Sequence, residues 1–132
     1  MYTQNDIVND WRVYYGMIYY ANLVIDGLEN FEARNAAERS RADELKGAAK
    51  FSRALGHFSL MQVFAAPYNP EQTSVSGIPL RTTADINLES GLSSTAEVYE
   101  LILSDLEFAR THLPDKAALA TRASKWSAEA LL

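Results

Sequence analysis

Cysteine is absent from the sequence, which excludes disulfides, zinc-thiolate sites and thiol chemistry from these 132 residues. Its absence also removes any inference about the redox compartment. Long apolar runs are missing too, so no segment has the length that a membrane span requires. Residues 1–5 do not have the features of a signal peptide, and we expect any export signal of a parent protein to lie outside this sequence.

Positive charge is scarce relative to negative charge. The chain has 12 Lys and Arg against 17 Asp and Glu, which gives a net charge of -5. Binding to nucleic acid needs clustered basic side chains that contact phosphates, and here the basic residues are scattered. We therefore expect no nucleic-acid partner, and we attribute the acidic surface to solubility.

Residues suited to catalysis or metal binding are also few. His57 has no serine or cysteine nucleophile in a recognisable pattern with it, and we expect a hydrogen-bonded or solvent-edge histidine. His112 falls in the last turn of a predicted helix, where its protonated form complements the negative helix end. No His-x-x-x-His or Glu-x-x-His spacing occurs, and no pair of carboxylates stands out for glycoside hydrolysis. We expect no enzyme activity, no cofactor and no metal site.

The central element is a helix predicted from Asp43 to Pro67. One side of it is apolar and consists of Leu45, Ala48, Ala49, Ser52, Gly56, Ser59, Leu60 and Val63. This side is unusually small because of Ala49, Ser52, Gly56 and Ser59. The small residues leave a groove in which a neighbouring helix can approach at the short end of the usual range of about 8–10 Å. Ser40 is the expected N-cap. The charged stretch from Glu29 to Glu44 is expected to be a solvated connection whose second half winds into this helix.

A long amphipathic helix is predicted from Asp6 to Leu28, with Asn5 or Asp6 as its N-cap. Its apolar stripe consists of Ile7, Trp11, Tyr14, Ile18, Ala21, Ile25 and Leu28. The far side carries Val13, Met17, Tyr20 and Val24, so we expect this helix to lie between other helices. Asn22 falls within the apolar stripe, and we expect its amide to hold a loop or a neighbouring helix end.

A long loop without periodicity follows the central helix and extends to Ser93. Pro67 and Pro70 end the helix, because proline lacks an amide donor and biases the preceding residue toward extended backbone. The loop is much longer than an ordinary connection, so it is either functional or ordered by packing. Ile78 and Leu80 are expected to attach it to the helices.

Two further helices are predicted in the last third of the chain. Residues 94–97 form a capping box that starts the third helix, and Pro114 stops it. A fourth helix runs from Ser124 to Leu132 and has no C-terminal cap. We therefore expect an all-α fold of two antiparallel helix pairs, tetratricopeptide-like in its stacking, with a long irregular loop between helices two and three. The single helical domain, residues 1–132, is expected to be a fragment of a longer protein.

Five short motifs lie along the chain. They are Tyr19-Tyr20-Ala21-Asn22; Gly47, Ala49, Phe51, Arg53 and Ala54; Ser76-Gly77-Ile78-Pro79-Leu80; Asp105-Leu106 with Ala109, Leu113 and Pro114; and Ser124-Lys125-Trp126-Ser127-Ala128-Glu129-Ala130-Leu131-Leu132. Together they resemble the SusD/RagB-like family, the outer-membrane nutrient-binding lipoproteins of Bacteroidetes. The resemblance covers nearly the whole chain but only part of a typical family member. Ala48 and Ser52 depart from it, since the family has glutamate and leucine at these positions.

The resemblance implies a surface-exposed lipoprotein of the cell outer membrane that binds an oligosaccharide or another nutrient without cleaving it. It also implies a TonB-dependent, SusC-like transporter as partner, with this region acting as helical scaffold and transporter-contact surface. The lipid anchor would then lie outside this chain. The alternative is a generic helical-repeat module that binds another protein, and an enzyme is the third hypothesis.

Aromatic side chains are the candidates for ligand binding, because sugar rings present apolar C–H faces to flat side chains. Tyr2, near a terminus, and Tyr68, in the proline-rich loop, are expected to be exposed. Trp11 is a further candidate, although its spacing fits the helix core, as does that of Trp126. Arg53 is either an anion-binding residue or a structural one, whose stem packs while its guanidinium pairs with a carboxylate of an adjoining helix.

Apolar surface on several faces of the first helix has a further consequence. Together with the fourth helix, which ends without a cap, it predicts that the isolated chain exposes apolar patches and self-associates.

Overall fold

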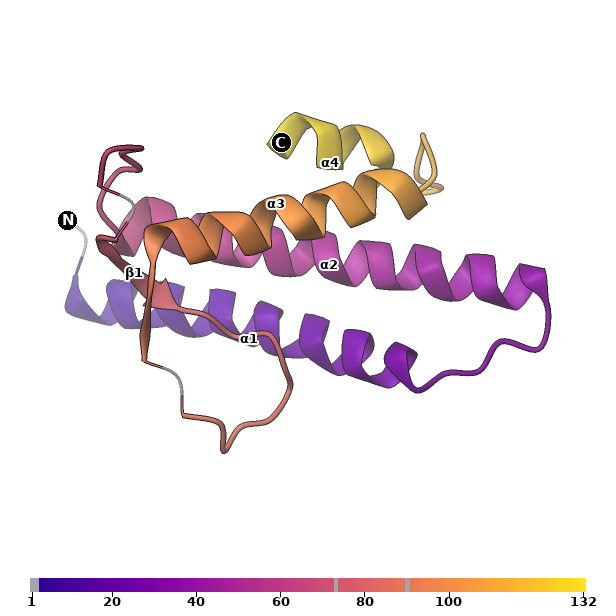
Figure 1. The fold of residues 1–132 in the computed structure, drawn as a ribbon, viewed down its shortest axis with the longest axis horizontal. Helices are drawn as coiled ribbons and strands as arrows, with labels where there is room; N and C mark the ends of the chain where they lie inside the picture. The colour runs from indigo at the N-terminus through magenta and orange to yellow at the C-terminus, as the bar shows by residue number, and fades with distance from the viewer. Residues whose placement is uncertain (1–2, 73, 90) are drawn as a thin grey trace.

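The computed structural model describes residues 3–72, 74–89 and 91–132 and shows a helical fold with a small sheet in the long loop (Figure 1). Its elements in chain order are α1 (Gln4–Glu29), α2 (Ala36–Phe64), β1 (Ser76–Pro79), β2 (Leu92–Ser94), α3 (Thr95–His112) and α4 (Lys125–Leu131). Consecutive helices run antiparallel, and α2 packs against both α1 and α3. The predicted all-α fold of two helix pairs is confirmed. Within the described residues, no helix is both long enough and apolar enough to cross a membrane.

The starts of the first two helices differ from the prediction. Thr3 caps α1 in a capping box, in which its hydroxyl accepts from the Asp6 amide and its own amide donates to the Asp6 carboxylate at 2.7 Å. Asn5 and Asp6, the predicted caps, therefore lie inside the helix. Asn35 caps α2 by accepting from the Glu38 amide at 2.9 Å, so Ser40 is not the cap.

The charged stretch before the central helix is mostly helical. Its second half was predicted to wind into the next helix, and residues 36–44 do form the first turns of α2. Alanine, glutamate and arginine are strong helix formers, and the pair Arg41–Glu44 forms an ion pair of 2.9 Å along the helix surface. Local propensity and ion pairs of this kind extend the helix well before its buried section.

The last two helices begin where the sequence predicted. Ser94 and Glu97 form the capping box of α3, with the Ser94 amide donating to the Glu97 carboxylate at 2.7 Å. Ser124 caps α4 and accepts from the Ser127 amide. The α3 helix ends at His112, two residues before Pro114.

The small residues of α2 do admit a close neighbour. A Cβ atom placed on Gly56 would lie 2.8 Å from Cγ1 of Ile18 on α1, which is nearer than side-chain atoms pack. The buried core around this contact consists of Ile18, Ala54, Leu60, Met61, Ile78, Val98, Ile102 and Leu106. Leu45 and Val63 were predicted on the same side but are 42% and 53% exposed, so this part of the prediction is wrong.

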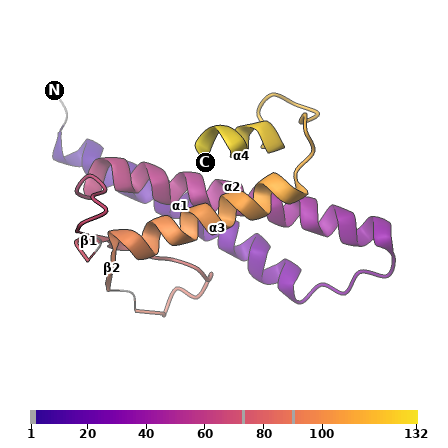
Figure 2. The same ribbon diagram turned by 45° about the horizontal axis from the view of Figure 1, so that its top comes forward.

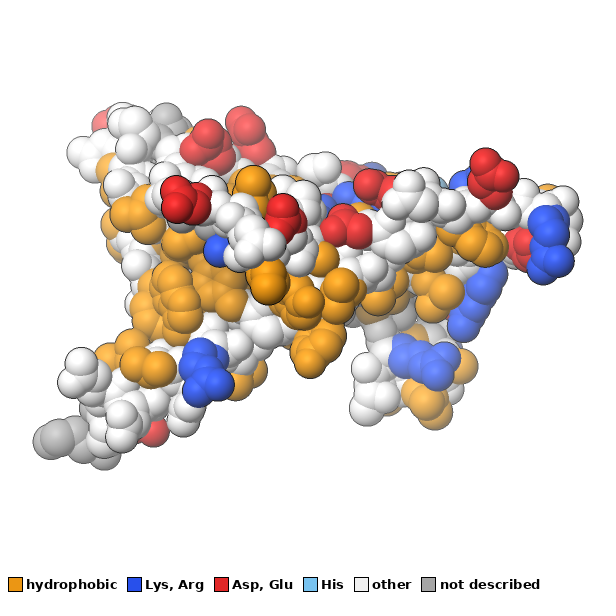
Figure 3. Space-filling model, turned by 90° about the horizontal axis from the view of Figure 1, so that it is seen from below, with side chains coloured by type: hydrophobic (Ala, Val, Ile, Leu, Met, Phe, Trp, Pro, Cys, Tyr) orange, Lys and Arg blue, Asp and Glu red, His pale blue; other side chains and the backbone are white. Residues whose placement is uncertain are grey.

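The outer side of α1 has no helical neighbour in the described residues. Val13 and Tyr20 are 66% and 69% exposed and Val24 is exposed as well, so the prediction that this helix lies between other helices is wrong for this side. Hydrophobic side chains form a broad band on the face of the molecule seen from below (Figure 3).

Trp126 was also predicted in the core from its spacing, but it is 59% exposed, because α4 packs through Ala128.

The long loop is closed at its base by a two-stranded antiparallel ladder. Ser76 pairs with Ser94 and Pro79 with Leu92, and the Thr95 amide donates to the Val75 carbonyl at 2.9 Å. These strands were not predicted, since their residues show no alternation of apolar and polar side chains. Ile78 is buried in the core and Leu80 packs against it, as expected. The loop and α4 lie on opposite sides of the α2–α3 layer (Figure 2).

Candidate functional site

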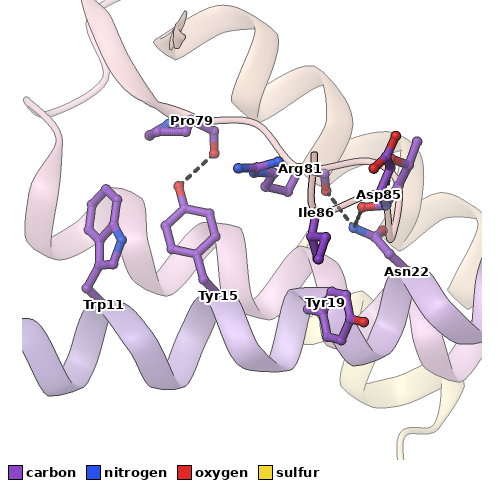
Figure 4. Close-up of a pocket in the computed structure, with 9 residues that line it drawn as sticks. Trp11, Tyr15, Tyr19, Asn22, Pro79, Arg81, Asp85 and Ile86 are labelled. Carbon is purple, nitrogen blue, oxygen red and sulfur yellow. Dashed lines mark hydrogen bonds between the residues drawn. The ribbon is translucent and has the colours of Figure 1, made fainter. Parts of the chain in front are cut away.

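A cavity of about 380 Å³ lies between α1 and the loop segment 79–86 (Figure 4). Its size falls within the range of roughly 300–1,000 Å³ that is typical of small-molecule sites. The lining residues are Trp11, Tyr15, Tyr19, Asn22, Pro79, Arg81, Thr83, Asp85 and Ile86. The first four come from α1 and the rest from the loop, so the cavity exists only because the loop returns to the first helix.

One wall of the cavity is aromatic. Trp11, Tyr15 and Tyr19 are spaced four residues apart, which places their side chains on one face of α1. The rings of Trp11 and Tyr15 are 4.8 Å apart between centroids, and Phe64 meets Trp11 edge-on at 5.0 Å. Figure 4 shows the three α1 side chains in a row along the helix. This row is a surface suited to the apolar face of a ring-shaped ligand.

The Tyr15 hydroxyl joins the aromatic wall to the loop. It donates a hydrogen bond of 2.6 Å to the Pro79 carbonyl oxygen. Burial raises the pKa of Tyr15, against a smaller opposing effect of the Arg81 charge. The phenol therefore keeps its proton and remains a donor.

The opposite wall is polar and comes from the loop. Arg81 donates from Nη1 to the Leu88 carbonyl at 2.7 Å, and within the described part of the chain it forms no ion pair. Asp85 accepts from the Asn87 amide through Oδ1 at 2.9 Å, while Ile86 is 75% exposed at the rim. This wall therefore offers guanidinium donors and carboxylate lone pairs to hydroxyl groups of a ligand.

A buried polar cluster lies beneath the cavity. The Arg53 guanidinium meets the Asp105 carboxylate on α3 through two hydrogen bonds of 2.7 and 2.8 Å, and Lys50 adds a third at 2.8 Å. Arg53 also donates to Asn22 Oδ1 at 2.9 Å. The structural interpretation of Arg53, pairing with a carboxylate of an adjoining helix, is confirmed.

Asn22 and His57 extend this cluster to the loop. Asn22 Nδ2 donates to the carbonyl oxygens of Arg81 and Thr83, both at 3.1 Å, which confirms the expectation that its amide holds a loop. His57 Nδ1 lies 3.0 Å from the Arg53 carbonyl oxygen, and its Nε2 accepts from the Arg81 amide at 3.4 Å. Burial lowers the pKa of His57 to about 4, so the ring is neutral with its proton on Nδ1.

The candidates singled out from the sequence are only partly brought together. Trp11 lines the cavity. Tyr68 is exposed, and its ring contacts Tyr99 at 5.2 Å rather than the cavity. Tyr2 lies outside the described residues. The four-residue spacing of Trp11, Tyr15 and Tyr19 was visible in the sequence, whereas nothing in the loop sequence indicated that Arg81 or Asp85 would face them.

Neither histidine takes part in a metal site in the described residues, where no group of three His, Asp or Glu side chains has a suitable arrangement. His57 is enclosed, as described above. His112, in the last turn of α3, directs Nδ1 to the Phe108 carbonyl oxygen at 2.8 Å and stacks on the Phe108 ring.

The chain matches a family model over residues 1–132. The family is SusD-like and is described as starch-binding and associating with the outer membrane. No match is found among curated proteins.

Solved structures share the fold. A SusD superfamily protein from Bacteroides thetaiotaomicron matches with a TM-score of 0.81 and 24% identity over 92% of this chain and 26% of that one. A SusD-like carbohydrate-binding protein from Bacteroides fragilis matches with a TM-score of 0.74 and 21% identity over 99% of this chain and 24% of that one. A structure determined with xylogluco-oligosaccharide matches with a TM-score of 0.68 and 19% identity over 98% of this chain and 23% of that one. The chain thus spans about a quarter of the length of each of these proteins.

Proposed function

The chain belongs to the SusD-like family of starch-binding proteins that associate with the outer membrane, and from this premise we propose that it is part of a protein that binds glycans for uptake and does not cleave them. We further propose that residues 1–132 are one helical domain of that protein. In this proposal the cavity between α1 and residues 79–86 contributes to the glycan site.

The observation that carries the proposal is the pairing of an aromatic wall with a polar one. Sugar rings have apolar C–H faces and a rim of hydroxyls, so a stacking surface opposite hydrogen-bonding groups suits them. Tyr19 and Trp11 supply the stacking surface, while Arg81 and Asp85 supply polar groups. A related fold has been determined with xylogluco-oligosaccharide, which supports the ligand class.

The carboxylates near the cavity support binding rather than hydrolysis. Glycoside hydrolysis uses two carboxyl groups separated by about 5–9.5 Å across the bond that is cleaved. Asp85 is the one carboxylate among the lining residues. Asp105 is fully buried and paired with Arg53 and Lys50, which leaves it no access to a ligand.

The outer side of α1 supports a protein partner. We infer that a TonB-dependent, SusC-like transporter contacts this helical region and that the whole protein is exposed at the cell surface through a lipid anchor outside this chain. Val13, Tyr20 and Val24 form an exposed apolar row on α1, and surfaces of this kind mark interaction sites.

Calorimetric titration with a glycan panel that includes maltoheptaose and a xyloglucan oligosaccharide tests the proposal. We expect binding without release of products, and a loss of about tenfold or more in affinity for Tyr19→Ala. Trp126→Ala is the matched control, because this exposed tryptophan lies outside the cavity lining, and its affinity should equal that of the wild type. If the protein bound no glycan in the panel and did not co-purify with a barrel transporter, the proposal would be abandoned.

A further inference from the structure

The loop segment from Pro79 to Ala84 is held by the packing of Leu80 against the core and by a series of hydrogen bonds to its backbone. Side chains of α1 and α2 form hydrogen bonds with six backbone groups along it. These bonds are Tyr15 Oη to Pro79 O at 2.6 Å, Arg81 N to His57 Nε2 at 3.4 Å, Asn22 Nδ2 to Arg81 O and to Thr83 O at 3.1 Å each, Arg53 Nη1 to Thr82 O at 3.1 Å, and Ala84 N to Asp26 Oδ2 at 2.8 Å. Hydrogen bonds of this kind do not depend on which side chains the loop carries.

The helix side chains that make these bonds are themselves fixed. Asn22 and His57 are fully buried, and the Arg53 guanidinium is locked by the Asp105 carboxylate. Asn22 Oδ1 accepts from Arg53, so the amide can turn only its Nδ2 toward the loop. These fixed donors and acceptors therefore restrict the loop backbone to one conformation.

The side chains of the segment have a different role. Arg81 and Thr83 line the cavity, as do Asp85 and Ile86 just beyond the held segment. In the described part of the chain the Arg81 side chain bonds to the Leu88 carbonyl of the loop, and Ile86 is largely exposed. The helices hold the backbone, and the loop side chains that line the cavity are left to face a ligand.

We propose that Asn22, Arg53 and His57 are positioning residues of the ligand site. They hold the backbone of residues 79–84 opposite the aromatic wall of α1, so that the cavity exists before a ligand binds. The side chains of Arg81, Asp85 and Ile86 then determine which glycan is selected. Exchanging these three alters selectivity but leaves the site in place. This inference rests on the function proposed above.

Hydrogen exchange and titration with maltoheptaose and the xyloglucan oligosaccharide test the inference on the same variants. Asn22→Asp keeps the acceptor for Arg53 but turns an oxygen toward the two loop carbonyls, and His57→Leu removes the acceptor for the Arg81 amide. For both, we expect exchange at the Arg81 and Ala84 amides to rise by about tenfold or more and affinity for the glycan that binds to fall by about tenfold. His57→Gln, which offers an acceptor again, should restore most of both losses.

Two further variants separate positioning from general stability and from selectivity. Ile102→Val removes a buried methylene group from α3, outside the cavity lining, and should leave exchange at both amides and affinity within about twofold of the wild type. Arg81→Gln should change the order of preference within the panel while exchange at Ala84 stays unchanged.

The outcomes distinguish this inference from the function on which it rests. Unchanged exchange at the Arg81 and Ala84 amides in Asn22→Asp and His57→Leu would overturn the inference, whatever the ligand. An equal loss of affinity in Ile102→Val would overturn it too, because the effect would then be one of stability alone. If the wild type bound no glycan but exchange still rose in the variants, the proposed function would be refuted. The role of Asn22 and His57 in holding the loop would still be supported.

Discussion

Arg53 and Asp105 form a bidentate ion pair in the interior, with Nε to Oδ2 at 2.7 Å and Nη2 to Oδ1 at 2.8 Å. The pair joins α2 to α3, and Lys50 brings a second positive charge to the same carboxylate. The same arginine also helps to hold the loop, because Nη1 of Arg53 donates to Asn22 Oδ1 and to the Thr82 carbonyl oxygen.

Asp105→Asn should lower the free energy of unfolding by about 3–5 kcal/mol, because it leaves the buried guanidinium without its counter-charge. Urea denaturation measures this change. Glu107→Gln is the matched control on the same helix, since it breaks the exposed Arg110–Glu107 pair of 2.8 Å, which should contribute about 0–1 kcal/mol. If the two variants lost similar amounts of unfolding free energy, the buried Arg53–Asp105 pair would contribute no more to stability than the exposed one.

Gly56→Ala should destabilise the protein by about 1–3 kcal/mol, because its new methyl group would lie 2.8 Å from Ile18 Cγ1 and force α1 away from α2. Gly16→Ala is the control, since a Cβ atom there meets nothing within 4 Å. By helix propensity alone, that variant should be more stable by about 0.5–1 kcal/mol. Thermal denaturation distinguishes the opposite signs, and a stabilised Gly56→Ala would mean that the helices are not in close contact here.

Acidification should weaken the fold through His57. Its pKa is lowered from 6.5 to about 4 in the folded protein, chiefly by burial. The hydrogen bond to the Arg53 carbonyl and the Asp105 charge oppose this lowering, and the Arg53 charge adds to it. The unfolded chain therefore takes up the proton first, so stability is complete above about pH 6.5 and falls as the pH drops toward 4, by roughly 3 kcal/mol in all.

The His57→Gln variant isolates this contribution, because carboxylate titrations are common to both proteins. The difference in unfolding free energy between wild type and variant, followed by urea denaturation from pH 7 to pH 4, should shift in favour of the variant as the pH falls. A difference independent of pH would argue that the imidazole is not enclosed in its neutral form.

The 132-residue chain should self-associate through the outer side of α1. Val13 and Tyr20 lie seven residues apart on this exposed apolar side, which has no helical neighbour in the described part of the molecule. Light scattering at increasing concentration should show a rising mean mass, and Val13→Glu combined with Tyr20→Glu should abolish the rise. A clean monomer at high concentration would contradict the prediction.

Much of the helical fold could be predicted because it depends on local chemistry. Apolar spacing locates the four helices of the described residues, and the capping residues Ser94 and Ser124 place the starts of two of them. The small side chain of Gly56 also indicated close approach of a second helix. The errors are of two kinds. Helix starts were misplaced, because charged residues continue a helix beyond its apolar pattern. Outer faces were misjudged, because periodicity cannot show that a neighbouring helix is missing, as at Trp126.

The candidate site was less accessible to sequence reasoning. The spacing of Trp11, Tyr15 and Tyr19 could have indicated the aromatic wall, but of the three only Trp11 was singled out as a site residue. The buried roles of Asn22 and Arg53 were expected in kind. Their hydrogen-bond partners could not be predicted, because Asp105 lies 52 residues beyond Arg53 and the loop carbonyls lie about 60 residues beyond Asn22. A loop without periodicity takes its course from such distant bonds, which only the folded arrangement brings together.

The ladder between Ser76 and Ser94 has an evolutionary consequence. Because the chain leaves and re-enters the helical layer at adjacent points, α2 and α3 do not depend on how many residues the excursion between them contains. Doubling the length of such a loop costs only about 0.6 kcal/mol in closure entropy. Insertions and deletions beyond Ala84 can therefore resize the mouth of the cavity while the helices beneath it stay in register.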